Sequence, residues 1–222
     1  MLIERSSADG IVELARHFPA VVVTGARQVG KTTLARALFP RHAYVSLDLP
    51  SLAELAEHAP AELLARFPPP VVIDEVQYAP GIFRHVKARV DADRHKMGAF
   101  VLTGSQRFAL MQAVSDSLAG RAAVVELETL GWHEITSAGG SFGGARELAS
   151  VIVRGGFPEL WRNRELDLDA FYSSYVATYL ERDVRQIVNV ASLRDFERFV
   201  RACAARNGQL LDKTSIGSDV GI

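Results

Sequence analysis

The feature that most constrains this chain is the stretch from Gly25 to Thr32, which spells GARQVGKT. It matches G-x-x-x-x-G-K-[ST], the pattern of a phosphate-binding loop. Residues 20–23 before it are apolar and β-branched and predict a buried strand, whereas residues 32–39 predict a helix that ends at Pro40. A loop between a strand and a helix directs its backbone N–H groups and the helix N-terminus at one point, where an anion is stabilised.

The loop positions have separate expected tasks. Gly25 and Gly30 allow backbone angles and a close approach that a Cβ would prevent. Lys31 places a positive charge on the β- and γ-phosphates, and the Thr32 hydroxyl is suited to bind Mg²⁺. The residues expected to bind the nucleotide here are Gly25, Ala26, Arg27, Gln28, Val29, Gly30, Lys31, Thr32 and Thr33.

The composition is that of an ordinary globular chain. Its 222 residues carry a formal net charge of -1 and are 48% hydrophobic, so no strong overall field attracts nucleic acid or an anionic membrane. Cys203 is the single cysteine, which excludes an internal disulfide and a cysteine-based zinc site. No apolar run approaches about 18 residues. We therefore expect a cytoplasmic location and no membrane span, and nucleic-acid binding is not indicated.

A second motif, at residues 71–75, reads VVIDE and ends in two carboxylates. A parallel strand delivers its last residues to the carboxyl edge of the sheet, where ligands bind. We expect Asp74 to hold Mg²⁺, through water, and Glu75 to polarise the attacking water. The alternative is a pair of surface carboxylates at a strand end. The distance of this pair from the phosphate loop favours the functional interpretation.

Two further places are candidates for contact with the γ-phosphate. Residues 99–105 predict a strand that ends in a polar turn, where Ser105 or Thr103 can reach the γ-phosphate or the attacking water. The alternative is a cap for the helix that follows. Arg121 directly precedes a predicted strand at 122–127. It would stabilise transition-state charge in cis or across a subunit interface, unless it is simply a solvated side chain.

Strands and helices alternate regularly up to residue 127. This order predicts an α/β fold with a parallel five-stranded sheet and helices on both faces. Residues 137–144 then carry four glycines in eight positions, which marks a domain boundary. We therefore expect residues 1–136 to form the sheet domain.

The chain beyond that boundary is expected to be helical. Residues 167–190 predict a long helix whose aromatic and apolar face belongs to a core and is not a platform for stacking bases. Another helix is expected to begin at Ser192, and residues 212–222 predict the opening of one more. We expect residues 137–190 to form an all-α lid.

The motifs resemble those of the AAA+ ATPases, which are P-loop proteins with a RecA-like sheet. The phosphate loop, the paired carboxylates, the polar turn and the corner at Arg121 carry this resemblance. Two later segments, GGFPE at 155–159 and YLERDV at 179–184, are similar to a prokaryotic group close to the archaeal-type and STAND ATPases. Members of that group pair an AAA+ module with a C-terminal domain of unknown function. The resemblance covers essentially the whole chain.

The resemblance implies ATP and Mg²⁺ as cofactors and a role for each matching residue. Gly156 and Pro158 match a Gly-x-Pro turn that packs near the nucleotide base in related lids. The implied catalytic residues are Glu75, Ser105 and Arg121, and the implied metal ligands are Thr32 and Asp74.

Members of that group continue through a winged helix-turn-helix and a further domain. Residues 191–222 match only the start of the winged helix. The resemblance therefore implies a truncated product, a fragment or a piece cut on purpose, and any partner or DNA binding by the missing part cannot be read from this chain.

Two functions from different classes follow. The first is Mg²⁺-dependent hydrolysis of ATP to ADP and phosphate, coupled to movement of the lid and to regulation of a protein partner or self-association. The second is a nucleotide-dependent switch or binding module with little or no turnover. Glu75 beside Asp74 favours turnover, and the relation to signalling ATPases favours a switch. A small P-loop kinase is disfavoured because we find no acceptor-binding signature.

Overall fold

The computed structural model describes residues 3–105, 114, 116–179 and 193–221. By its internal contacts the chain forms two compact units, Met1–Glu165 and Leu166–Ile222. Each unit is described here by itself.

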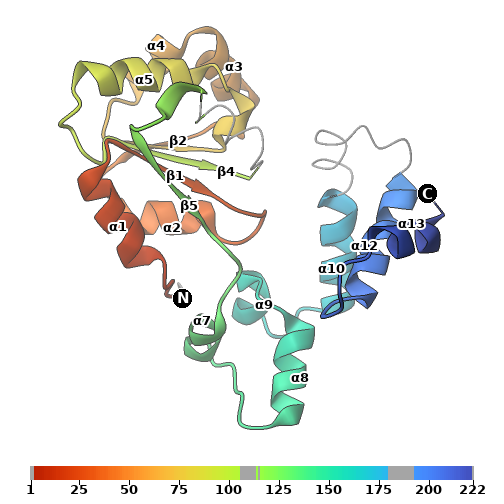
Figure 1. The fold of residues 1–222 in the computed structure, drawn as a ribbon. Coiled ribbons are helices and arrows are strands. Elements are labelled where there is room, and N and C mark those ends of the chain that lie inside the picture. Colours follow the sequence, from red (N-terminus) through yellow and green to blue (C-terminus); the bar gives the residue numbers. More distant parts are fainter. Residues whose placement is uncertain (1–2, 106–113, 115, 180–192, 222) are drawn as a thin grey trace. The chain divides into compact units, whose positions relative to one another are not determined.

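The first unit is built on a five-stranded sheet with all strands parallel, in the order β2-β3-β4-β1-β5 (Figure 1). The predicted parallel five-stranded α/β fold is therefore confirmed. Short apolar runs form the central strands because both faces of the sheet are covered by helices. The strands are β1 (Ala20–Thr24), β2 (Ala43–Ser46), β3 (Val71–Asp74), β4 (Phe100–Gly104) and β5 (Ala122–Glu126).

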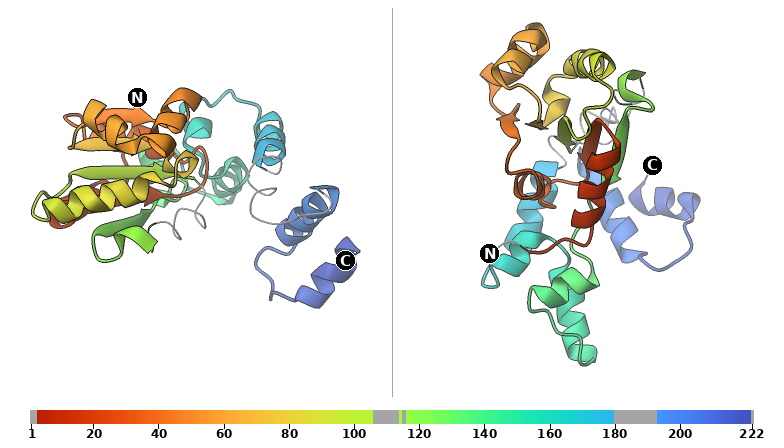
Figure 2. Two further views of the ribbon diagram at one scale, coloured as in Figure 1. Left: turned by 90° about the horizontal axis from the view of Figure 1, so that it is seen from above. Right: turned by 90° about the vertical axis from the view of Figure 1, so that its left-hand side faces the viewer.

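Alternate residues of each strand face opposite helical layers. Val22, Ile73 and Leu102 pack in the cluster under α3, α4 and α5, whereas Val21 and Val72 pack in the cluster under α1 and α2. Figure 2 shows these two helical layers from further sides. The helices are α1 (Ala8–His17), α2 (Lys31–Leu38), α3 (Pro50–His58), α4 (Pro60–Arg66) and α5 (Ile82–Ala92), with a short 3₁₀ turn η1 (Val76–Tyr78) after β3.

The strand register brings the polar strand ends to one edge. Thr24 at the end of β1 pairs with Gly104 at the end of β4, and Ile73 of β3 pairs with Leu102 of β4. Asp74 and Thr103 therefore lie side by side at the carboxyl edge, next to the loop that leaves β1. This is the edge at which open α/β sheets bind ligands.

The segment after β5 stays with the first unit. It contains α7 (Trp132–Ser137), α8 (Ala145–Arg154) and α9 (Pro158–Arg162). Leu160 and Trp161 of α9 are buried, and the Trp161 ring N–H donates to the Gly155 carbonyl at 2.7 Å. The expected lid range, 137–190, is thus divided between the two units, and its action as a lid stays a prediction.

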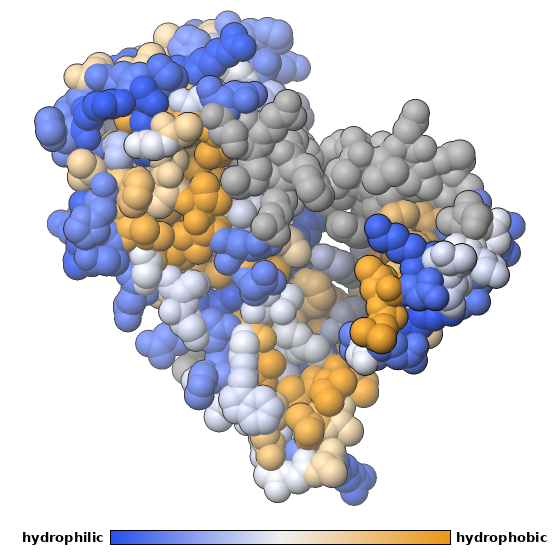
Figure 3. Space-filling model, in the orientation of Figure 1, coloured by the Kyte–Doolittle hydropathy of each residue, from blue (hydrophilic) through white to orange (hydrophobic). Residues whose placement is uncertain are grey.

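The α8 helix differs from the other helices of this unit because none of its residues is buried. Its apolar side chains include Ile152, which is 69% exposed, and Val153, which is 65% exposed. Figure 3 shows apolar surface gathered over the part of the first unit that contains α7, α8 and α9.

The second unit contains α10 (Leu168–Tyr179), α12 (Leu193–Ala205) and α13 (Lys213–Val220). Asp212 caps α13 by accepting hydrogen bonds from the Thr214 and Ser215 N–H groups at 3.0 and 3.2 Å. Arg206 fixes α12 to α13 through an ion pair with Asp219 and a 2.9 Å hydrogen bond to the Ser215 hydroxyl. Residues 180–190 of the predicted long helix lie outside the described residues.

Across the ranges that the structure describes, every helix is too short or too polar to cross a membrane.

Candidate nucleotide-binding site

The loop between β1 and α2 has positive φ angles at Gly25, Gln28 and Gly30. Gly25 has φ of 144°, and a Cβ on it would lie 2.2 Å from the Leu127 carbonyl oxygen. Gly30 has φ of 95° and stands directly before the first turn of α2. The sequence therefore folds here into a left-handed turn at a helix N-terminus, which is the geometry of an anion site.

Lys31 lies inside this loop. Its side chain is only 5% exposed, and its ammonium group donates to the Gly25 and Ala26 carbonyl oxygens at 3.0 and 2.7 Å. An ammonium group held over its own loop is placed to meet a phosphate that the loop binds.

Asp74 is the centre of a ring of hydroxyl groups. Its carboxylate accepts hydrogen bonds from Thr32 at 2.9 and 3.0 Å, from the Tyr44 hydroxyl at 3.0 Å and from the Thr103 hydroxyl. Asp74 is 3% exposed, and within the part of the chain that the structure describes the donors to its carboxylate are these neutral hydroxyl groups. A buried carboxylate beside a threonine hydroxyl is a donor set that suits Mg²⁺. Thr32 and Asp74, the metal ligands predicted from the sequence, are the residues that would hold the ion, and this role stays a prediction.

Tyr44 stands beside that carboxylate. Its partial burial, together with the negative charge of Asp74 and the hydrogen bond to it, raises the pKa of Tyr44 to about 12. The phenol therefore stays protonated and donates to Asp74 at physiological pH.

Glu75 follows Asp74 in a left-handed conformation, with φ of 59°. Its N–H donates to the Thr103 hydroxyl at 3.2 Å. Its carboxylate accepts from the Gln77 amide and, at 3.4 Å, from the Ser105 hydroxyl. A non-glycine residue with positive φ carries strain of about 1 kcal/mol or more, which is found at functional sites. Glu75 and Ser105, both predicted from the sequence, therefore lie together.

A buried ion pair between Arg5 and Glu134 contacts the phosphate loop. The three guanidinium nitrogens of Arg5 each donate to a different acceptor: Nε to the Glu134 carboxylate at 3.1 Å, Nη1 to the Val29 carbonyl at 2.7 Å and Nη2 to the Glu128 carbonyl at 2.6 Å. Glu134 also accepts the Ser6 and Gly131 N–H groups, both at 2.7 Å. The sequence analysis missed this pair because its two residues are 129 positions apart, and no local pattern marks either one.

A cavity of about 260 Å³ opens beside the start of α2. Its wall combines the N-terminal segment, the phosphate loop and α9, and it consists of Ile3, Arg5, Val29, Gly30, Thr33, Leu34, Pro158 and Arg162. Pro158 is held there because the Leu130 N–H donates to the Gly156 carbonyl at 2.7 Å. A Cβ on Gly156 would lie 2.8 Å from the Thr129 hydroxyl. The structure thus brings the predicted Gly156–Pro158 turn next to the loop.

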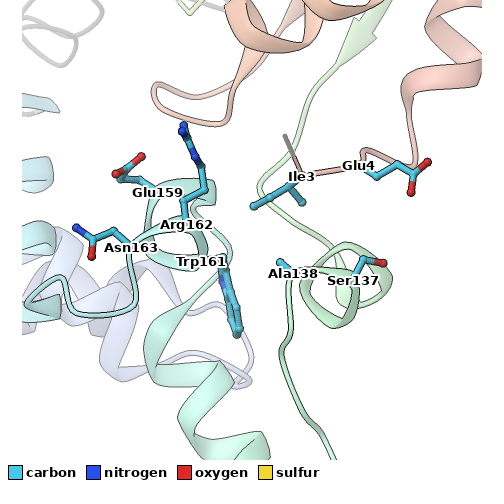
Figure 4. A pocket seen from close by; sticks show the side chains of 8 residues that line it. All are labelled: Ile3, Glu4, Ser137, Ala138, Glu159, Trp161, Arg162 and Asn163. Atoms are coloured by element: carbon cyan, nitrogen blue, oxygen red, sulfur yellow. The ribbon is translucent and has the colours of Figure 1, made fainter. Parts of the chain in front are cut away.

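A larger cavity, of about 760 Å³, adjoins the first and shares Ile3 and Arg162 with it. Figure 4 shows that Glu159, Trp161, Arg162 and Asn163 of the α9 region form one side, and that Ile3, Glu4, Ser137 and Ala138 form the other.

Arg121 is not brought to this site. It precedes β5, and its carbonyl accepts the N–H of Ala20, the first residue of β1, at 3.3 Å. A parallel strand begins at the amino edge, so the five residues of β1 separate Arg121 from the phosphate loop by roughly 16 Å. Its guanidinium binds Asp91 at 2.6 and 3.2 Å. The geometry does not support the role in cis, and the role across a subunit interface stays a prediction.

A family model described as an AAA domain matches residues 17–136, which contain the loop, the paired carboxylates and all five strands. The chain belongs to the AAA family. A second model, described as a domain of unknown function, DUF8612, matches residues 145–222 of this AAA protein. The resemblance read from the sequence is therefore confirmed.

Two curated relatives and a solved structure are similar to this chain. Two uncharacterized proteins, Mb2031c of Mycobacterium bovis and Rv2008c of Mycobacterium tuberculosis, are each 31% identical over the whole chain. The AAA chain spans 49% of the length of these relatives. Among solved structures, a Walker-type ATPase of Pyrococcus abyssi is similar with a TM-score of 0.55 and 14% identity, over 99% of this chain and 89% of that one. That likeness concerns the fold alone.

Proposed function

We propose that this AAA chain binds ATP with Mg²⁺ and hydrolyses it to ADP and phosphate. One observation carries the proposal: Lys31, Thr32, Asp74 and Glu75 meet at the carboxyl edge of the sheet, at the N-terminus of α2. In phosphoryl transfer to water, the protein chiefly positions the reacting groups and stabilises the charge of the transition state. These residues are suited to both tasks.

Each group has a separate task in this proposal. The N–H groups of residues 25–33 and the Lys31 ammonium group bind the β- and γ-phosphates. Mg²⁺ supplies charge neutralisation when it is bound, and Thr32 and Asp74 would hold it. Glu75 orients the attacking water and takes its proton, while the neighbouring Ser105 hydroxyl can hold the same water or the γ-phosphate.

The cavity of about 260 Å³ is proposed to take the nucleotide base. Its apolar wall of Ile3, Leu34 and Pro158 suits one face of a purine ring. Because Pro158 and Arg162 belong to α9, base binding would link the sheet to the segment after β5. We propose that nucleotide exchange moves this segment, as expected for a lid, and thereby regulates a partner protein or self-association.

A specific observation favours the second function, a switch with slow turnover. The Glu75 carboxylate already accepts hydrogen bonds from Gln77 and Ser105. Both hydrogen bonds fall on Oε2 and hold the side chain against Gln77 and Ser105. A water out of reach of Oε1 would be activated only after this cluster rearranges, which would make turnover slow.

The test is ATP binding and Mg²⁺-dependent phosphate release by the purified chain and by Glu75→Gln. Hydrolysis should fall about a hundredfold or more in Glu75→Gln with ATP binding retained, and Glu54→Gln on the exposed face of α3 serves as the matched control. Hydrolysis that survives Glu75→Gln unchanged contradicts the assignment of Glu75. Tight binding without turnover in the unaltered chain favours the switch.

A further inference from the structure

Tyr44 belongs to none of the motifs that identify the site, yet its hydroxyl donates to Asp74 Oδ2 at 3.0 Å. We propose that Tyr44 is a positioning residue that sets the orientation of the Asp74 carboxylate for Mg²⁺. This inference rests on the proposed function, since it assigns a role toward the ion of that same site.

The sheet register explains how an edge strand reaches the metal position. Ser46 of β2 pairs with Asp74, and Tyr44 pairs with Val72. Residues two apart on a strand face the same side, so Tyr44 lies diagonally across from Asp74 on the face covered by α2. A long aromatic side chain can span this diagonal distance, whereas a serine or threonine at position 44 would be too short.

The Tyr44 ring contacts both a cation and apolar side chains. The guanidinium of Arg36, on α2, lies 4.7 Å from the centre of the Tyr44 ring, and the ring packs against the apolar cluster under α2. Arg36 is one turn after Thr32, the other predicted metal ligand. The ring is therefore held between the helix that starts at the phosphate loop and the carboxylate that faces it.

The hydrogen bonds divide between the two carboxylate oxygens. Oδ1 accepts from Thr103 and Oδ2 accepts from Tyr44, while Thr32 contacts both at 2.9 and 3.0 Å. The Thr32 hydroxyl has one proton and can donate it to only one of the two oxygens at a time. Thr103 and Tyr44 each give one oxygen a donor of its own, and this pair fixes the rotation of the carboxylate. Without the Tyr44 hydroxyl, Oδ2 would depend on the Thr32 proton, which it shares with Oδ1.

The surroundings of the ring make its hydroxyl hard to replace. A cavity of about 560 Å³ opens on this side, and Thr32, Arg36, Tyr44 and Val72 belong to its wall. If the hydroxyl were removed, water from that cavity would compete for Oδ2, and mobile water does not fix a carboxylate as a side chain held by packing does.

The experiment is isothermal titration of ATP, with Mg²⁺ and with EDTA, into the unaltered chain and into Tyr44→Phe. The dissociation constant measured with EDTA, divided by that measured with Mg²⁺, reports how much the metal strengthens ATP binding. This measurement needs no turnover. Loss of one charge-assisted hydrogen bond should reduce this ratio about tenfold in Tyr44→Phe, with metal-free ATP binding unchanged within about twofold.

Arg36→Gln is the matched control because it removes the contact with the ring but keeps the hydroxyl. It should leave the ratio within about twofold of the unaltered chain. A thermal melt of each variant shows that both are folded before the ratios are compared.

The outcomes separate this inference from the proposed function. If the unaltered chain binds no ATP, or gains nothing from Mg²⁺, the proposed function fails. If the unaltered chain gains affinity from Mg²⁺ and Tyr44→Phe gains as much, only the role of Tyr44 is overturned. The role of Tyr44 is also overturned if Tyr44→Phe loses the same ATP affinity with and without Mg²⁺. It is likewise overturned if Arg36→Gln changes the ratio as much as Tyr44→Phe does, because either result indicates a structural role.

Discussion

Two aspartates lie near opposite edges of the same sheet, Asp74 at the end of β3 and Asp91 on α5, and their charges are balanced in opposite ways. At the carboxyl edge, Asp74 is buried and receives hydrogen bonds from three neutral hydroxyl groups. At the amino edge, the side chain of Asp91 is 29% exposed and pairs with Arg121 and Lys87 at 2.6 and 2.8 Å. Hydrogen bonds from Arg121, and then from Lys87, hold the pKa of Asp91 well below its usual range.

The difference shows what separates a ligand site from a structural charge cluster. The charge of Asp91 is already balanced by three cations in contact with solvent, Arg121, Lys87 and, at 3.5 Å, Arg94, so a metal ion would gain little there. The charge of Asp74 is balanced only by neutral dipoles in a water-poor place, where a bound cation gains much more. Burial and neutral partners therefore support the carboxyl edge as the proposed metal site more than the presence of an acidic residue does.

The largest expected effect is at the phosphate loop. Lys31→Ala removes the charge that faces the phosphates, so ATP affinity should fall about a hundredfold or more, roughly 3 kcal/mol. Lys87→Ala, a lysine paired with Asp91, should leave ATP affinity unchanged. Isothermal titration measures the ATP affinity of both variants. Equal losses of affinity would contradict the distinction between the carboxyl edge and the exposed charge cluster around Asp91.

The next effect is on stability. Arg5→Ala leaves Glu134 buried without its cation, which should lower the free energy of unfolding by about 3 kcal/mol. The value lies near the lower end of the usual range because the Ser6 and Gly131 N–H groups still solvate the carboxylate. Urea unfolding measures it.

The matched control for that variant is Arg16→Ala on α1, where the arginine is 69% exposed and pairs with Glu13 at 2.8 Å. It should leave the unfolding midpoint unchanged. If Arg5→Ala is as stable as Arg16→Ala, the buried pair does not support the loop as described.

A smaller effect concerns pH. Burial of Glu134 acts to raise its pKa, but hydrogen bonds from Gly131 and Ser6 and the charge of Arg5 outweigh it and hold the pKa below the ordinary 4.5. A carboxyl group with a lowered folded-state pKa contributes stability above its unfolded pKa, and this contribution is lost as pH falls through the folded value. The unaltered chain should therefore lose stability below about pH 4.5 more steeply than Glu134→Gln, as measured by urea unfolding at several pH values.

The smallest effect is expected at the amino edge. Arg121→Gln removes an exposed ion pair about 16 Å from the phosphate loop, so ATP affinity of the single chain should not change. The measurement is titration at low protein concentration, followed by turnover at rising concentration. A loss of turnover that appears only at high concentration would support the role across a subunit interface, and a loss of affinity at low concentration would contradict the placement of Arg121.

The sequence was sufficient where one local pattern determines both structure and chemistry. The spacing of Gly25, Gly30 and Lys31 requires a left-handed turn before a helix, and the structure has that turn. The run that ends in Asp74 had to finish at the carboxyl edge because a strand buried on both faces is parallel to its neighbours. The catalytic and binding roles of these residues stay predictions.

Other parts of the site depend on long-range register. The contact between Tyr44 and Asp74 follows from the pairing of β2 with β3, which the sequence of either strand alone does not specify. The contact between Arg5 and Glu134 joins two segments with no shared pattern. The placement of Arg121 could have been derived, because a residue that precedes a parallel strand lies at the edge opposite the ligands.

The ion pair between Arg5 and Glu134 has a consequence for the order of synthesis. A ribosome makes the phosphate loop, residues 25–33, before it makes Glu134. The strand that precedes the loop, β1, pairs with β4 and β5, which are also made later. The wall of the adjoining cavity closes only after Glu134, and then Pro158 and Arg162, have left the ribosome. A nascent chain shorter than this would present the loop without the pocket beside it, so nucleotide added during translation should protect the growing chain from proteolysis only late in its synthesis.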